Sequence, residues 1–114
     1  MTNLKKLIPF LGKTELNDLL NKVLASPNQV YKDVELKDLL CFLENDAIDN
    51  LFIEQLKRGQ NVDCFYPFVS DETLKNIVNL YCNDKLDYAI DIKKFALYLD
   101  DDDVKMLYNY MLKK

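Results

Sequence analysis

A single pattern of apolar residues occurs four times in this chain and aligns without internal gaps. The four copies cover Asn3–Leu24, Glu35–Leu56, Asn61–Cys82 and Asp91–Leu112. The eighth position of each copy is aromatic and holds Phe10, Phe42, Phe68 and Tyr98. One such unit cannot bury its own apolar face, whereas several stacked units share a continuous core. The repetition therefore predicts a fold built from tandem units.

Each copy predicts two helices joined by a tight corner. In the second copy, apolar residues at i, i+3, i+4 and i+7 mark one face of a short helix; they are Leu36, Leu39, Leu40 and Leu43. A polar break then separates this set from a second apolar set with the same spacing, which predicts a longer helix. We expect the four long helices at residues 13–25, 45–58, 71–83 and 101–113.

Residues that favour helix ends stand at the expected boundaries. Ser70 and Asp100 are suited to cap the amino-terminal ends of the third and fourth long helices. Pro9 and Pro67 should end or distort the short helices that contain them, because the residue before a proline avoids the helical region. Gly59 suits the left-handed conformation that follows a helix. These signals strengthen the predicted element order.

The predicted fold class is all-α, with four tandem helix-pair repeats and about eight helices, stacked as a compact bundle or a short solenoid. We expect no strands. We expect a single domain over residues 1–114, and proline in the first and third copies indicates two tandem halves. The repeat units run over about residues 3–34, 35–60, 61–90 and 91–114. The arrangement resembles the helix-pair repeats of HEAT and armadillo type in architecture, although the unit is shorter.

Composition narrows the classes of function. The net charge is −4, and no basic stripe is present that could bind a phosphate backbone, so we expect no nucleic-acid partner. No apolar run approaches the roughly 18 residues of a membrane-spanning helix. The first apolar stretch is short and interrupted by proline, so we expect no secretory signal. We therefore expect a cytoplasmic protein that does not enter a membrane.

The residues that carry most enzyme and metal chemistry are missing. The chain has no histidine, two glycines and three cysteines that form no close pair. Without histidine, a histidine-activated nucleophile is excluded. The cysteines do not support a zinc site, and the two glycines do not support a phosphate-binding loop. We expect no enzymatic activity, no cofactor and no bound metal. The run Asp100–Asp103 leaves two interpretations, a capped first helical turn or a Ca²⁺ or Mg²⁺ site, of which capping is favoured.

Three apolar residues fall at repeat positions where other copies are polar. Tyr110 aligns with Lys22 and Glu54, and Met106 aligns with Asp18 and other polar residues. With Leu80 from the preceding unit, Met106 and Tyr110 form the candidate interface. The alternative is that the last helix packs back and buries them. Three other tyrosines align with core positions and should be buried: Tyr81, Tyr98 and Tyr108.

Two functions remain open. The first is a non-enzymatic protein-interaction module, acting on a foreign partner or as a homodimer, with Leu80, Met106 and Tyr110 as the contact residues. The second is a small-molecule binding or sensing domain with an apolar pocket between the two halves. The residues expected to line that pocket are Phe65, Phe68, Phe95 and Tyr98.

Overall fold

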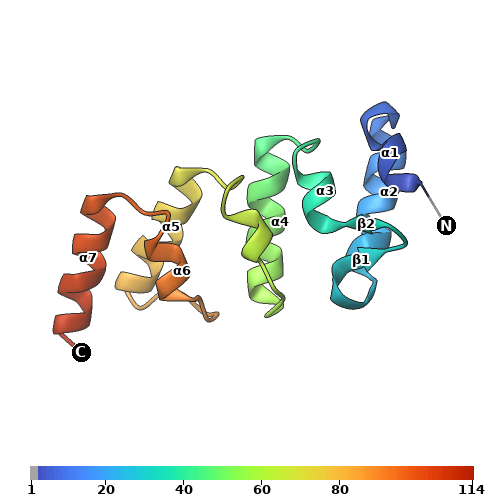
Figure 1. The fold of residues 1–114 in the computed structure, drawn as a ribbon. Helices are drawn as coiled ribbons and strands as arrows, with labels where there is room; N and C mark the ends of the chain where they lie inside the picture. The colour runs from blue at the N-terminus through green and yellow to red at the C-terminus, as the bar shows by residue number, and fades with distance from the viewer. Residues whose placement is uncertain (1–2) are drawn as a thin grey trace. The chain divides into compact units, whose positions relative to one another are not determined.

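The structure is a computed structural model that describes residues 3–114, and it is mostly helical (Figure 1). The α-helices are α1 (Leu4–Leu7), α2 (Lys13–Leu24), α3 (Leu36–Leu40), α4 (Asn45–Lys57), α5 (Asp71–Cys82), α6 (Ile92–Ala96) and α7 (Asp101–Leu112). Three 3₁₀ turns accompany them, η1 (Ile8–Phe10), η2 (Pro27–Gln29) and η3 (Asp63–Phe65). A short helical segment thus precedes each of the four long helices.

The long helices α2, α4, α5 and α7 begin at the predicted residues and end one residue earlier than predicted. Two of the starts are fixed by side-chain caps. Ser70 Oγ accepts a hydrogen bond from the backbone N–H of Thr73 at 3.2 Å, and Asp100 Oδ1 accepts one from Asp103 at 2.9 Å. Each cap satisfies a backbone donor that has no partner inside its helix.

The expected chain breaks are also present. Pro9 lies inside the 3₁₀ turn η1, and Pro67 follows η3 in a turn. Gly59, which follows α4, has a φ of 71° and therefore occupies the left-handed region. Ile8 and Tyr66, which precede the two prolines, keep helical backbone angles, so the expectation that they avoid the helical region was wrong.

The expectation of no strands was wrong. The connector after α2 holds two short antiparallel strands, β1 (Val30–Tyr31) and β2 (Val34–Glu35). Lys32 in the turn between them has a φ of 55°, in the left-handed region that matches the twist of a tight hairpin. Lysine has no preference for this conformation, so it does not indicate a turn. A two-residue strand is too short to give an alternating pattern.

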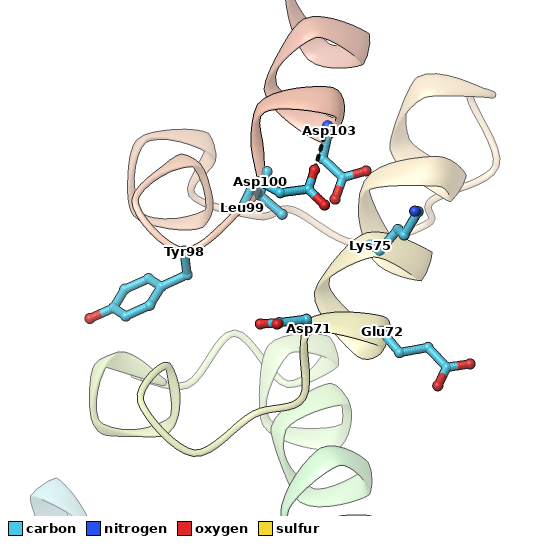
Figure 2. A pocket seen from close by; sticks show the side chains of 7 residues that line it. All are labelled: Asp71, Glu72, Lys75, Tyr98, Leu99, Asp100 and Asp103. Carbon is cyan, nitrogen blue, oxygen red and sulfur yellow. Dashed lines mark hydrogen bonds between the residues drawn. The ribbon is translucent and has the colours of Figure 1, made fainter.

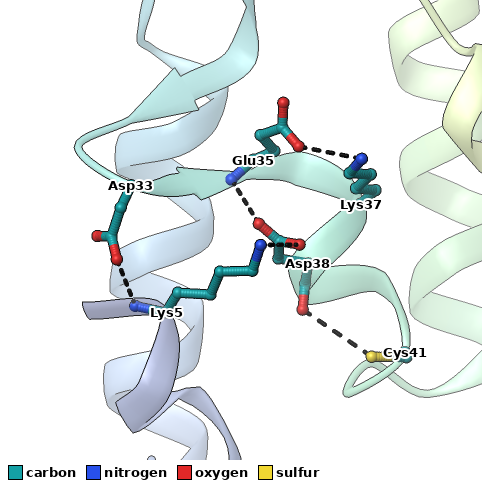
Figure 3. A network of polar contacts seen from close by, with 6 residues as sticks. All are labelled: Lys5, Asp33, Glu35, Lys37, Asp38 and Cys41. Carbon is teal, nitrogen blue, oxygen red and sulfur yellow. Dashed lines mark hydrogen bonds and ion pairs between the residues drawn. The ribbon is translucent and has the colours of Figure 1, made fainter. Parts of the chain in front are cut away.

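The chain divides into two compact units, of which the first ends at Glu44 and the second spans Asn45–Lys114. In the first unit, polar contacts hold α1 against the hairpin and α3 (Figure 3). The backbone N–H of Lys5 donates to Asp33 at 3.2 Å, and its ammonium lies 3.5 Å from Asp38. Asp38 also accepts a hydrogen bond from the backbone N–H of Glu35 at 2.9 Å, so one carboxylate joins three segments.

The second unit is built around an aromatic core. Phe52 of α4 is fully buried, and its ring centroid lies 5.5–6.0 Å from those of Phe65, Tyr66 and Phe95. Tilted and edge-on rings at these distances are favourable beyond the area that they bury. At the end of this core, Ser70 donates to the Asp49 carboxylate through its hydroxyl at 2.8 Å and its N–H at 3.0 Å. These bonds fix the start of α5 on α4.

Within residues 3–114, no helix combines the length and the apolar character that crossing a membrane requires.

Candidate functional site

The structure brings two of the three candidate interface residues together. Met106 and Tyr110 lie on the side of α7 that faces α5, and both are half-buried. The Tyr110 ring packs on Tyr81 with a centroid distance of 5.2 Å. The backbone carbonyl of Met106 accepts a weak hydrogen bond from the Cys82 thiol at 3.9 Å. Much of the apolar surface of Met106 and Tyr110 is therefore covered by α5 within the second unit.

Polar contacts also fix Tyr110. Its hydroxyl donates a hydrogen bond to the Asp84 carboxylate, and the Lys114 ammonium lies 5.2 Å from its ring centroid. The hydrogen bond raises the pKa of the Tyr110 hydroxyl, since a protonated oxygen is needed to donate. The same bond, with help from Lys114, lowers the pKa of Asp84. Tyr110 thus connects the last helix to the connector after α5.

Leu80 is placed elsewhere. It lies on the side of α5 that faces α4 and lines a groove of about 240 Å³ with Ile53, Leu86 and Tyr88. Met106 and Tyr110 line a different depression together with Cys82. Leu80 and Tyr110 hold the same position in successive repeats, so each faces the long helix that precedes its own.

An apolar surface that the sequence pattern did not predict lies on the opposite side of α7. Four residues at i, i+4, i+7 and i+8 make up this surface, which we call the outer stripe: Val104, Tyr108, Met111 and Leu112. Their side chains are exposed by 40, 63, 45 and 67%, respectively. Residues at this spacing share one helical face. Tyr108 was predicted to be buried, and that prediction was wrong.

The repeat alignment shows why the outer stripe is unusual. The positions of Val104 and Tyr108 correspond to Ile48 and Phe52 in α4, which are buried. In α5 they correspond to Leu74 and Val78, and these are buried as well. In the described chain, α7 packs on α5 but no further helix covers its other side. The same apolar pattern is therefore core in α4 and α5 and surface in α7.

The prediction that Tyr98 is buried was also wrong, since 44% of it is exposed. One face of its ring stacks on Tyr66 with a centroid distance of 5.2 Å and an interplanar angle of 11°. The other residues at the same repeat position are exposed too; they are Phe10, Phe42 and Phe68. The aromatic eighth position thus marks the surface of each corner and not the core.

The acidic run at the start of α7 borders a pocket of about 440 Å³ (Figure 2). Asp100 and Asp103 face the first turns of α5, from which Asp71, Glu72 and Lys75 line the pocket. The backbone N–H of Asp103 lowers the pKa of Asp100. Burial raises the pKa of Asp103, and the neighbouring Asp100 charge adds to the effect.

This arrangement matches helix capping. Asp100 supplies the cap, and the three aspartates after it place negative charge at the positive end of the helix dipole. Among the described residues, no group of three or more Asp, Glu or Cys side chains could hold a metal ion.

The residues expected to line a small-molecule pocket do not share one surface. Phe65 and Phe95 are fully buried against Phe52, so their rings fill the core. Phe68 and Tyr98 are exposed. Phe65 and Phe95 therefore serve as core residues of the second unit, and the four aromatic residues do not line one pocket.

The sequence also carries a signal for the outer stripe. The last helix carries apolar residues on two opposite faces, one with Met106 and Tyr110 and the other with Val104, Tyr108 and Met111. A helix with a single neighbour can bury only one such face.

No protein-family model, no curated protein and no solved structure matches this chain.

Proposed function

We propose that this protein is a non-enzymatic, cytoplasmic interaction module of four tandem helix-pair repeats. A helix of a protein partner binds to the outer stripe of α7. The single observation that carries this proposal is the exposure of Val104 and Tyr108 at positions that are buried in α4 and α5. Contiguous exposed apolar surface often marks a site of protein association, and aromatic residues dominate the energy of such contacts.

In this proposal Met106 and Tyr110 support the contact surface and do not form it. Met106 and Tyr110 hold α7 on α5 through Cys82 and Tyr81, so they position the outer stripe for a partner. Leu80 belongs to a separate groove and would contact a partner only if that partner extended beyond α7.

The alternative of a small-molecule binding domain is less well supported. The apolar groove beside Leu80 holds about 240 Å³. Sites for drug-sized molecules usually hold roughly 300–1,000 Å³ and enclose most of the ligand. This groove is therefore small for a metabolite of ordinary size, and the larger pocket at the start of α7 is lined mainly by charged residues and by only one of the expected aromatic rings, Tyr98.

A site-specific cross-link tests the interaction. Tyr108→benzoylphenylalanine, illuminated in cells, should attach to a protein partner and give a band of higher mass. Asn109→benzoylphenylalanine is the matched control, because Asn109 is exposed on the same helix but lies off the outer stripe. Equal labelling at positions 108 and 109, or none at position 108, would contradict the proposal.

A further inference from the structure

The partner of the outer stripe can be inferred from the way helices pair within the second unit. The next long helix in the sequence after α5 is α7, and it packs along one side of α5 (Figure 1). Contacts run from Tyr81 to Tyr110 and from Cys82 to Met106. The corresponding side of α7 is the outer stripe, which is also apolar, so we infer that a helix packs on it as well. This inference rests on the proposed function, since it names the partner at the same surface.

Three of the four outer-stripe residues are evenly spaced about Tyr108, while Met111 has Lys105 as its counterpart on the other side. Tyr108 is four residues from Val104 and four residues from Leu112, which is about one helical turn on either side. If two α7 helices meet in antiparallel orientation with Tyr108 facing its counterpart, Val104 of each copy lies beside Leu112 of the other. The surface is therefore complementary to itself about a twofold axis, as an isologous dimer contact requires.

The charges at the two ends of α7 favour the antiparallel orientation. Asp100–Asp103 stand at the amino-terminal end, and Lys113 and Lys114 stand at the carboxyl-terminal end. An antiparallel pair brings the acidic end of one helix near the basic end of the other. A parallel pair would bring the exposed Asp101 and Asp102 of one copy near those of the other, which costs free energy.

The first long helix offers no comparable surface for a head-to-tail contact. The large apolar residues of α2 are buried or half-buried, and its exposed side carries Asp18 and Lys22, which pair with each other at 2.9 Å. We propose that the protein forms a twofold dimer in which the outer stripes of two antiparallel α7 helices pack against each other. Tyr108 lies at the centre of this contact.

Sedimentation velocity tests the dimer across a concentration series that reaches roughly 1 mM, where even weak association is populated. Wild-type protein should shift from monomer to dimer as its concentration rises. Tyr108→Lys should remain monomeric with unchanged helical circular dichroism. Asn109→Lys adds the same charge off the stripe and should dimerise like wild type. If Tyr108→Lys is poorly folded, Met111→Lys replaces it.

Two results would overturn the dimer. A wild-type protein that stays monomeric at every concentration would do so, while cross-linking of a foreign protein at position 108 would leave the proposed function intact. A dimer that persists in folded Tyr108→Lys and Met111→Lys would place the contact on another surface. The proposed function would then be tested separately by the cross-link at position 108.

Disulfide trapping tests the orientation. In a background with Cys41→Ser, which removes the exposed native thiol, Val104→Cys and Leu112→Cys variants are oxidised separately and as a mixture. The antiparallel dimer predicts that the mixture forms covalent dimers and that each variant alone does not. Efficient cross-linking of each variant with itself would show a parallel pair and overturn the proposed geometry.

Discussion

The helices α4 and α7 carry the same repeat pattern but present it to different surroundings. Phe52 in α4 is fully buried among three aromatic rings, whereas Tyr108 at the same repeat position in α7 is 63% exposed. The pattern fixes which residues share a helical face, but it does not determine what covers that face. Burial depends on the neighbouring elements, and in the described chain α4 and α5 are covered on this side whereas α7 is not.

The largest effect should separate these two equivalent positions. Phe52→Ala should lower the free energy of unfolding by about 3–5 kcal/mol, because it leaves a cavity among Phe65, Tyr66 and Phe95. Tyr108→Ala should change it by less than about 0.5 kcal/mol, as expected for a surface position. Urea unfolding at low protein concentration, where the monomer prevails, measures both. Similar losses in the two variants would mean that α7 is covered as α4 is.

A smaller effect should distinguish the caps of α5 and α7. Ser70→Ala should cost about 1–2 kcal/mol, because it removes the cap to Thr73 and a hydrogen bond to Asp49 in α4. Asp100→Ala should cost less, since it also removes the negative charge beside buried Asp103.

The same unfolding experiment measures both cap variants. Asp100→Asn keeps a side-chain oxygen for the cap and serves as the control. A loss in Asp100→Ala that equals or exceeds the loss in Ser70→Ala would contradict this ranking.

The buried carboxyl at the start of α7 should produce a dependence on pH. The pKa of Asp103 is raised in the folded protein, so the folded state keeps its proton to a higher pH than the unfolded state does. This group therefore favours folding at acidic pH, and that contribution is lost as the pH rises through the folded pKa. In Asp103→Asn this loss should be absent.

Urea midpoints for wild type and Asp103→Asn, compared from about pH 3 to pH 7, test the assignment. The variant should gain stability relative to wild type as the pH rises. Two parallel curves would show that Asp103 titrates with the same pKa in the folded and unfolded states.

The smallest effect concerns the side of α7 that faces α5. Tyr110→Phe removes the hydroxyl that donates to Asp84, so the pKa of Asp84 should rise toward the usual aspartate value. Titration of this carboxyl by NMR measures the change. Lys114→Met provides a comparison, because it removes the second donor, which lies 3.3 Å from Asp84. An unchanged pKa in Tyr110→Phe would show that the hydroxyl does not reach the carboxylate in solution.

The sequence predicted features that depend on a few neighbouring residues. The starts of α5 and α7 were correct because Ser70 and Asp100 bond to donors three residues away. The break at Gly59 was correct for the same reason, since its left-handed backbone is a local property. The hairpin was missed because its turn depends on Lys32, a residue with no preference for that conformation.

Features that depend on distant contacts could be predicted only in part. The repeat marks Met106 and Tyr110 as unusual, but it does not indicate their partners Cys82 and Tyr81, because these contacts depend on the packing of α7 on α5. The exposure of Tyr108 could not be read from the repeat, because its equivalents in α4 and α5 are buried. A repeat position therefore predicts direction on a helix better than it predicts burial.

The central tyrosine of the aromatic core has a consequence for alkaline solutions. Tyr66 lies within the cluster of Phe52 and Phe95 and is 5% exposed. Burial, reinforced by Asp91 and Asp63, raises its pKa from 10.0 to about 12. An unfolded chain loses this proton near pH 10, so between those two values each increase in pH favours unfolding. The upper limit of the pH range in which this fold persists is therefore influenced by one phenol in its interior.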